Sequence, residues 1–248
     1  MREPELRIHD TPSALAADVA ERLLVVIRDA QAAGRVPAIC LTGGTIADTI
    51  HSVVAAAAAH AGIDWRRVAF WWGDERFVAA DSTDRNAVQA RTALLDSLDL
   101  DPALVHEVPS VESAGSVDEA AAAYGDLVRA EGGGEFDVVM LGMGPDGHVA
   151  SLFPGFPQLT VDDTIAVGVT GSPKPPPERV SLTFAALNRT RATWLVVSGE
   201  AKAAAVAAAL TSSEPATAAE IAEIPARGVS GTRETVWFLD SPAASALP

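Results

Sequence analysis

The sequence predicts an α/β protein in which a doubly wound, mostly parallel sheet carries helices on both faces. Apolar runs of strand length alternate with segments of helical periodicity along most of the 248 residues. The run 136–141 has no polar alternation after Asp137, which is typical of a strand buried on both faces. Hydrophobic residues make up 48% of the chain, enough for a substantial core. No linker-like stretch or repeat divides the chain, so we expect a single domain over residues 1–248.

The first elements follow from capping signals and apolar spacing. Residues 6–9 are a short strand candidate, and Thr11-Pro12 is typical of an N-cap followed by proline at the first helical position. A helix to about residue 33 is then predicted by four apolar residues at helical spacing, which are Leu15, Val19, Leu23 and Ile27. We expect a buried strand at 36–41 and a helix at 45–61.

The later elements continue the alternation. We expect strands or extended segments at 67–72, 104–108, 136–141, 164–169, 180–183, 193–197 and 236–239. We expect helical segments at 86–98, 117–130, 184–187 and 200–210. The proline-rich segment 173–177 should be a stiff extended loop, and residues 241–248 should be a frayed tail.

The balance of charge argues against some classes of partner. The chain has 18 Lys and Arg against 33 Asp and Glu, a formal net charge of -15. We therefore expect no nucleic acid and no membrane partner, and any phosphate site must be a locally positive region of an otherwise negative surface. The single cysteine, Cys40, lies in an apolar run and allows no disulfide framework. No apolar run approaches the roughly 20 residues of a membrane span, and no signal region is evident, so we expect a cytoplasmic protein.

Four short segments follow predicted strands directly, at 43–45, 73–76, 142–148 and 199–202. In open α/β sheets, ligands bind beyond the carboxyl ends of the strands. We therefore expect these segments to lie along one edge of the sheet and to form a site.

The segment Gly43-Gly44-Thr45 has the composition of an anion-binding turn. Two residues without side chains let backbone N–H groups approach an anion closely, and the following helix adds its dipole. Thr45 offers a hydroxyl as well. The alternative is a plain strand-to-helix turn with Thr45 as the N-cap. The segment has neither the lysine of a nucleotide phosphate loop nor the glycine pattern of a dinucleotide fingerprint.

Two basic residues are candidates for neutralising the same anion. Lys202 lies in the first turn of a predicted helix, where a cation opposes the helix dipole by about 0.3–1 kcal/mol, and a bound anion would offset that cost. Arg179 precedes an apolar strand, and its planar fork suits phosphate oxygens. The alternatives are a solvated lysine balanced by Glu200 and a surface ion pair between Arg179 and Glu178.

His148 is the candidate for acid–base catalysis. It follows Asp146-Gly147 in a glycine-containing loop beyond a predicted buried strand. An unperturbed imidazole has a pKa near ~6.5, so it is mostly neutral and basic at neutral pH. Asp146 could orient the ring, and a purely structural histidine is the alternative. The other histidines are scattered and there is one cysteine, so we expect no metal site. No serine lies in a GxSxG elbow, which leaves a serine hydrolase unsupported.

The charged triplet Asp74-Glu75-Arg76 follows an aromatic strand. Arg76 is a candidate for stabilising a developing oxyanion or for contacting the substrate, with Asp74 or Glu75 holding it in place. The alternative is that these charges cap the next element.

Several of these stretches together resemble the 6-phosphogluconolactonase family, within a larger group that includes glucosamine-6-phosphate deaminases. The resemblance spans Leu41 to Lys202 and rests on LTGGT, WGDER, GMGPDGHVASLFP, RVSLT and SGEAK. Deaminases share the Asp-Gly-His turn but usually continue with a Phe-Asn-Glu-Pro-like sequence. Here the continuation is Ser151-Leu152-Phe153-Pro154, which resembles the lactonase branch. The family often has proline after the glycine turn, whereas here Thr45 is followed by Ile46.

The resemblance implies a Rossmann-like α/β fold and hydrolysis of 6-phospho-D-glucono-1,5-lactone in the oxidative pentose phosphate pathway, without a cofactor. Under this hypothesis the catalytic residues are His148, Asp146 and Arg76. The substrate-binding residues are then Gly43, Gly44, Thr45, Asp74, Arg179 and Lys202. We expect a phosphosugar lactone as the small-molecule partner and a monomer or weak homo-oligomer. Two rival functions are an amino-sugar phosphate isomerase or deaminase and a non-catalytic sugar-phosphate sensor.

Overall fold

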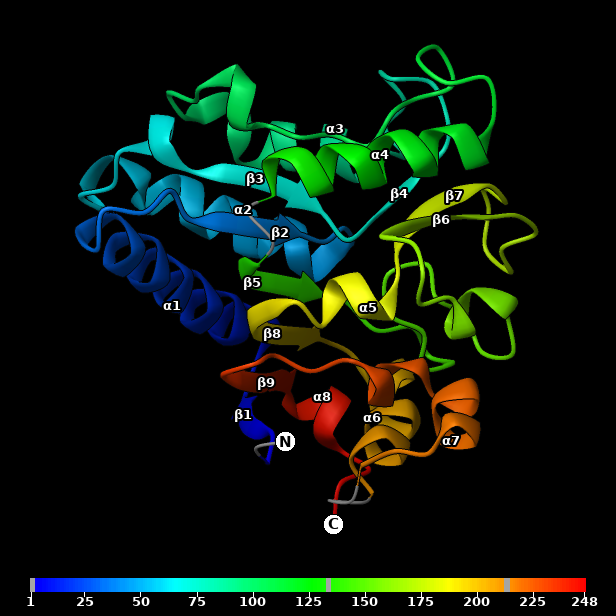
Figure 1. Ribbon diagram of the computed structural model, residues 1–248. Coiled ribbons are helices and arrows are strands. Elements are labelled where there is room, and N and C mark those ends of the chain that lie inside the picture. The colour runs from blue at the N-terminus through cyan, green and yellow to red at the C-terminus, as the bar shows by residue number, and fades with distance from the viewer. Residues whose placement is uncertain (1–2, 133–134, 212–214) are drawn as a thin grey trace.

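The computed structural model describes residues 3–132, 135–211 and 215–248, and a parallel sheet forms its centre (Figure 1). Within these residues the sheet has six strands in the order β1-β9-β8-β5-β2-β3, and every pairing between neighbours is parallel. The strands are β1 Glu5–His9, β2 Ala38–Leu41, β3 Ala69–Trp72, β5 Phe136–Leu141, β8 Thr190–Val197 and β9 Glu234–Asp240. Helices lie on both faces of the sheet, so the predicted fold class is confirmed.

The helices keep most of the predicted positions. They are α1 Pro12–Ala32, α2 Thr45–Ala57, α3 Asn86–Ala93, α4 Val117–Glu131, α5 Phe184–Leu187, α6 Ala203–Leu210, α7 Ala218–Glu223 and α8 Ser241–Ala244. Thr11 caps α1 by accepting a hydrogen bond from Ala14 N at 3.1 Å, as the sequence predicts. Within the described residues, no helix is both long and apolar enough to cross a membrane.

Burial follows the expected apolar pattern. All six residues of β5 are buried, which confirms a strand covered on both faces. The four α1 residues that predicted the helix are buried as well, and they belong to the same hydrophobic cluster as the central strands. Cys40 of β2 is fully buried in this cluster, and burial raises the pKa of its thiol well above the usual range.

A second, antiparallel sheet of three strands stands beyond the carboxyl end of β3. Its order is β4-β7-β6, with β4 Asp74–Arg76, β6 Ala166–Val169 and β7 Arg179–Leu182. We expected strands or extended chain at 164–169 and 180–183, but the triplet 74–76 was expected only as a loop. Three charged residues carry no apolar strand signal, and pairing with β7 alone makes them a strand.

Three segments differ from the prediction. The strand expected at 104–108 is reduced to a single bridge between Val105 and Phe70. A 3₁₀ turn at Pro102–Leu104 precedes this bridge, because Asp101 caps a turn that starts with Pro102. The helix expected to Leu98 ends at Ala93, where the backbone of Leu94 leaves helical geometry. The helix α7 was not predicted, although its N-cap Thr217 and Glu220 in its first turn form a capping box.

The expected frayed tail at 241–248 begins with the helix α8, whose Ala243 is fully buried. Asp240, at the end of β9, caps this helix by accepting a hydrogen bond from Ala243 N at 2.8 Å. The same buried carboxylate accepts bonds from Ser198 Oγ at 2.5 Å and from Gly199 N at 3.0 Å. Asp240 therefore joins the C-terminal helix to the turn that leads from β8 into α6.

His51, in the middle of α2, gives the fold a dependence on pH. Its side chain is 1% exposed, and neither ring nitrogen has a hydrogen-bond partner among the described residues. Burial lowers the pKa of His51 to about 4. An unfolded chain has a histidine pKa near ~6.5, so between these values the unfolded state binds a proton that the folded state does not. Stability is therefore lost as the pH falls through this interval.

We predict that His51→Leu removes this loss. Relative to the variant, the wild type should lose up to about 3 kcal/mol of unfolding free energy between pH 7 and pH 4. Urea unfolding at several pH values measures the difference. Burial also raises the pKa of Glu75 to about 6, and this shift favours the folded state as the pH falls. Glu75 is present in both proteins, so its contribution cancels in the difference between their unfolding free energies. A pH-independent difference between the two proteins would contradict the prediction.

Candidate active site

A pocket of about 200 Å³ lies where β2, β3, β5 and β8 end and where the small sheet begins. Of the predicted site residues, it is lined by Gly43, Gly44, Asp74, Arg76, His148, Arg179 and Lys202. Thr45 adjoins it as the first residue of α2, and Asp146 contacts His148 beside it. The lining also includes Gly142, Met143 and Gly144 of the expected 142–148 segment. Further lining residues, which the sequence prediction did not include, are Thr42, Asn86, Ala150 and Lys174.

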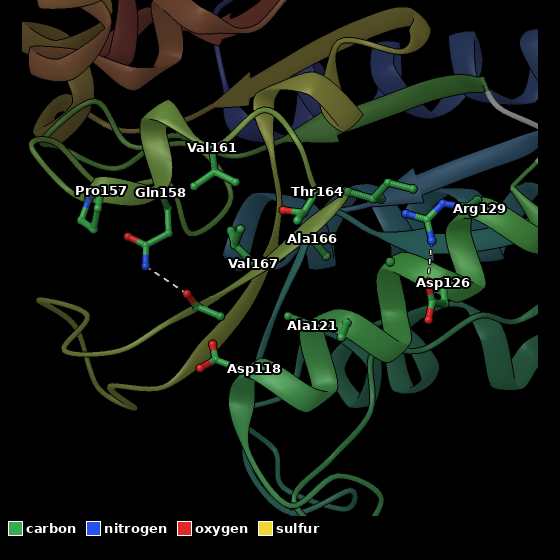
Figure 2. Close-up of a pocket in the computed structure, with 14 residues that line it drawn as sticks. Asp118, Ala121, Asp126, Arg129, Pro157, Gln158, Val161, Thr164, Ala166 and Val167 are labelled. Carbon is green, nitrogen blue, oxygen red and sulfur yellow. Dashed lines mark hydrogen bonds and ion pairs between the residues drawn. The ribbon is translucent and has the colours of Figure 1, made fainter.

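A larger cavity of about 500 Å³ lies elsewhere, between α4 and the segment that leads into β6 (Figure 2). Its walls are mostly small or apolar side chains, such as Ala121, Ala166 and Val167. Arg129 pairs there with Asp126 at 2.5 Å. None of the predicted site residues lines this cavity, so its size does not make it the better candidate for the chemistry.

The turn into α2 lines the pocket with the uncapped start of a helix. Gly44 is the N-cap, with φ at 101°, and no side chain caps this helix end within the described residues. Thr45 is the first helical residue and Gly44 is the N-cap, so the expectation of Thr45 as N-cap is wrong. Gly43 is required by packing, because a Cβ there would lie 1.9 Å from Asn86 Oδ1.

His148 and Asp146 form a close pair in the loop that follows β5. Asp146 Oδ1 lies 2.5 Å from His148 Nδ1, and the ring packs against Phe153 with centroids 4.6 Å apart. The carboxylate at Nδ1 selects the tautomer with its proton there, which leaves Nε2 as the basic nitrogen. Burial lowers the pKa of His148, and this outweighs the opposing influence of Asp146. The ring is therefore neutral at neutral pH.

The glycines of this loop hold the pair in place. A Cβ on Gly144 would lie 2.1 Å from His148 Nδ1 and 2.3 Å from Asp146 Oδ1, so the two side chains use the space that a larger residue would fill. Gly144 N also donates to His148 O at 2.9 Å, which closes the loop. Ala150 has a φ of 50°, a left-handed conformation that is uncommon for alanine and stores strain beside the pocket.

The charged triplet separates into three roles. Arg76 Nη1 donates to Asn86 Oδ1, so among the described residues an amide holds the guanidinium, and the expected support by Asp74 or Glu75 is indirect. Asp74 is buried and accepts from Ser151 Oγ at 2.6 Å, while its backbone oxygen accepts from Asn86 Nδ2 at 2.8 Å. Asp74 thus fixes the amide that fixes Arg76.

Glu75 is a remote helix cap. Its carboxylate is fully buried and accepts from the backbone N–H groups of Asn86 at 2.7 Å and Ala87 at 2.9 Å, which begin α3. It also accepts from Arg76 N at 2.8 Å. Burial raises the pKa of Glu75 to about 6, against the effect of Arg85 and these hydrogen bonds. The capping alternative therefore holds for this member of the triplet.

Arg76 is joined in the lining of the pocket by three further cationic side chains. Lys202, Lys174 and Arg179 all line it. Burial lowers the pKa of Lys202, and repulsion from Lys174 lowers it further. Arg179 donates to backbone oxygens of the 173–177 loop and not to Glu178 in the described structure. The sequence prediction missed Lys174 and Asn86, because a lysine among prolines and an asparagine at a helix start carry no chemical signal of their own.

Comparison with known proteins agrees with these features. The family model described as glucosamine-6-phosphate isomerases/6-phosphogluconolactonase matches residues 10–237. The chain is 43% identical to the 6-phosphogluconolactonase of Streptomyces coelicolor, over 99% of this chain and 95% of that protein. It is 40% identical to the 6-phosphogluconolactonase of Mycobacterium tuberculosis, over 94% of both chains.

The chain belongs to the glucosamine-6-phosphate isomerase/6-phosphogluconolactonase family. Within this family, the solved structure of 6-phosphogluconolactonase from Trypanosoma brucei is similar over 100% of both chains, with a TM-score of 0.85 and 27% identity. A monomeric glucosamine-6-phosphate deaminase is also similar, with a TM-score of 0.81 but only 17% identity. The shared fold therefore does not separate the two activities, and the identity to lactonases does.

The geometry of the histidine pair predicts its titration. NMR of the ring protons should show a pKa of His148 below the ordinary value, because burial opposes the charged form. In Asp146→Asn the pKa should fall further, since the attraction of the carboxylate for the imidazolium is lost. Asp126→Asn, which removes a charge beside the other cavity, is the control. A pKa in the wild type above the ordinary value, or a rise in Asp146→Asn, would contradict this assignment.

Proposed function

We propose that the protein hydrolyses 6-phospho-D-glucono-1,5-lactone to 6-phosphogluconate, a step of the oxidative pentose phosphate pathway, and that His148 carries out the proton transfers. The observation that carries the proposal is the pocket that His148 shares with the Gly43-Gly44 turn and with Lys202. An acid–base group and an anion-binding end in one cavity suit a phosphorylated ester. The identity to lactonases over the full chain supports the same reaction.

The phosphate would bind between the glycine turn and the cationic side chains of the pocket. The Gly43-Gly44 turn would offer backbone donors and the dipole of α2, the Thr45 hydroxyl adjoins the pocket, and Lys202 and Arg179 supply charge. Anchoring the far end of the substrate fixes the ring, so binding energy remote from the reacting bond positions the carbonyl.

The ester would open by attack of water on C1. His148 Nε2 takes a proton from the water as the C–O bond forms, and Asp146 stabilises the imidazolium that results. His148 then returns the proton to the ring oxygen as the C1–O bond breaks. Arg76, held by Asn86, faces the same pocket and stabilises the tetrahedral oxyanion. These steps need no covalent intermediate.

We further propose a cytoplasmic enzyme, and its net charge of -15 argues against nucleic-acid or membrane partners. The oligomeric state is proposed as monomer or weak homo-oligomer. The deaminase and sensor alternatives predict ammonia release from glucosamine 6-phosphate and tight phosphosugar binding without turnover, respectively. Hydrolysis of freshly generated lactone, measured by proton release above the spontaneous rate, tests the proposed activity directly.

We predict that His148→Ala lowers kcat about 10²–10⁴-fold while KM changes little, because general base catalysis is lost and the phosphate anchor is kept. Proton release from the lactone measures both constants. His60→Ala, an exposed histidine beyond the far end of α2, is the control and should retain wild-type kinetics. Wild-type kcat in the His148 variant would exclude the proposed base.

Lys202→Ala should act mainly on binding. We expect KM for the phosphorylated lactone to rise about tenfold or more, because a charge-assisted contact to phosphate is lost. Hydrolysis of unphosphorylated gluconolactone should be unchanged, since that substrate lacks the anchored group. Equal losses for the two substrates would show that Lys202 does not contact the phosphate.

A further inference from the structure

The chain contains only two lysines, and both line the same pocket. Of its 18 basic residues, 16 are arginines, and the two lysines are Lys174 and Lys202. They come from different parts of the fold, because Lys174 lies in the loop between β6 and β7 and Lys202 lies just before α6. We infer that Lys174 is a second cationic ligand of the substrate's phosphate and that Arg179 is a positioning residue that holds it there. This inference rests on the proposed function.

Arg179 is bonded to the loop that carries Lys174. Its Nη2 donates to Lys174 O at 3.1 Å and to Pro175 O at 3.3 Å, and its Nε donates to Pro176 O at 3.3 Å. The guanidinium also lies over the Phe153 ring, 5.9 Å from its centroid. Arg179 is 5% exposed, so these contacts fix a buried and rigid fork.

The loop has an internal support as well. Ser172 Oγ donates to Lys174 O at 3.0 Å, Lys174 N donates to Ser172 Oγ at 3.3 Å, and Ser172 N donates to Pro177 O at 3.0 Å. Prolines at 173 and 175–177 limit the backbone further. The position of Lys174 is therefore set by the arginine, the serine and the prolines together.

The two ammonium groups act on one another in the free pocket. Lys174 lowers the pKa of Lys202 by repulsion, after the effect of burial, and it also contributes to the lowered pKa of His148. Two interacting cations in one pocket are unfavourable without an anion between them. A phosphate dianion removes this repulsion and bonds to both, which suits a protein whose average field repels anions.

The donors of Arg179 distinguish its role from that of a direct ligand. Nε and Nη2, which would otherwise grip two phosphate oxygens side by side, are occupied by backbone oxygens of the loop. A lysine in this position would supply the charge but not the planar fork. The Nε and Nη2 side of the guanidinium is therefore assigned to the placement of Lys174, and the loop does not use the Nη1 N–H groups.

Lysine-selective isotope labelling tests the lysine pair without relying on turnover. The side-chain signals of both lysines should shift together, with a single affinity, when inorganic phosphate is titrated at constant ionic strength. Lys174→Met should weaken phosphate binding roughly ten- to a hundredfold, as loss of a charge-assisted bond requires. Arg129→Met, which removes an exposed arginine beside the other cavity, should leave the affinity unchanged. A shift of Lys202 alone, or wild-type affinity in Lys174→Met, would overturn the inference.

A double-mutant cycle tests the role of Arg179. If Arg179 acts through Lys174, Arg179→Lys and Lys174→Met should each raise KM for the phosphorylated lactone, and the double variant should be no worse than Lys174→Met. Additive losses would make Arg179 a direct ligand and overturn its positioning role. In each variant, a shift of the Lys202 side-chain signal on addition of phosphate shows that the pocket is still folded.

The two tests separate this inference from the proposed function. A wild-type protein that binds phosphate through both lysines but does not hydrolyse the lactone would refute the activity and leave the lysine pair standing. A wild-type protein that hydrolyses the lactone, with unchanged KM in Lys174→Met, would refute the lysine pair alone.

Discussion

The candidate site depends on one geometric constraint, the parallel arrangement of β2, β3, β5 and β8. Because these strands run in the same direction, their carboxyl ends open on one edge of the sheet. The turns that follow them carry the glycine pair, the charged triplet, the histidine loop and Lys202. The sheet therefore brings together residues that are more than 150 positions apart in sequence, from Gly43 to Lys202.

The pocket combines positive charge with carboxylates whose charge is compensated. Its lining includes Arg76, Lys174, Arg179 and Lys202, while Asp146 and the buried Asp74 lie beside hydrogen-bond donors that compensate their charge. Burial keeps the imidazole neutral, and it also strengthens every remaining charge interaction in the site. A chain with a net charge of -15 can in this way present a locally positive surface to an anion.

The sequence predicted well those features that have a local physical cause. Glycine pairs after apolar runs, the cap of α1 and the buried β5 all follow from short-range patterns. It predicted poorly those that depend on tertiary pairing. Asp74–Arg76 becomes a strand only through β7, and Glu75 caps a helix that begins eleven residues later. Lys174 lies 28 positions from Lys202, so only the folded loop brings the two lysines together.

The carboxylate of Asp240 has a practical consequence for anyone who expresses this protein. It links α8, near the C-terminal end of the chain, to Ser198 and Gly199, three residues before Lys202. A truncation that removes α8, or an affinity tag that prevents α8 from packing, would remove the hydrogen bond from Ala243 N to this carboxylate. The disturbance would then reach Lys202 in the lining of the pocket, so purification handles are best kept away from α8.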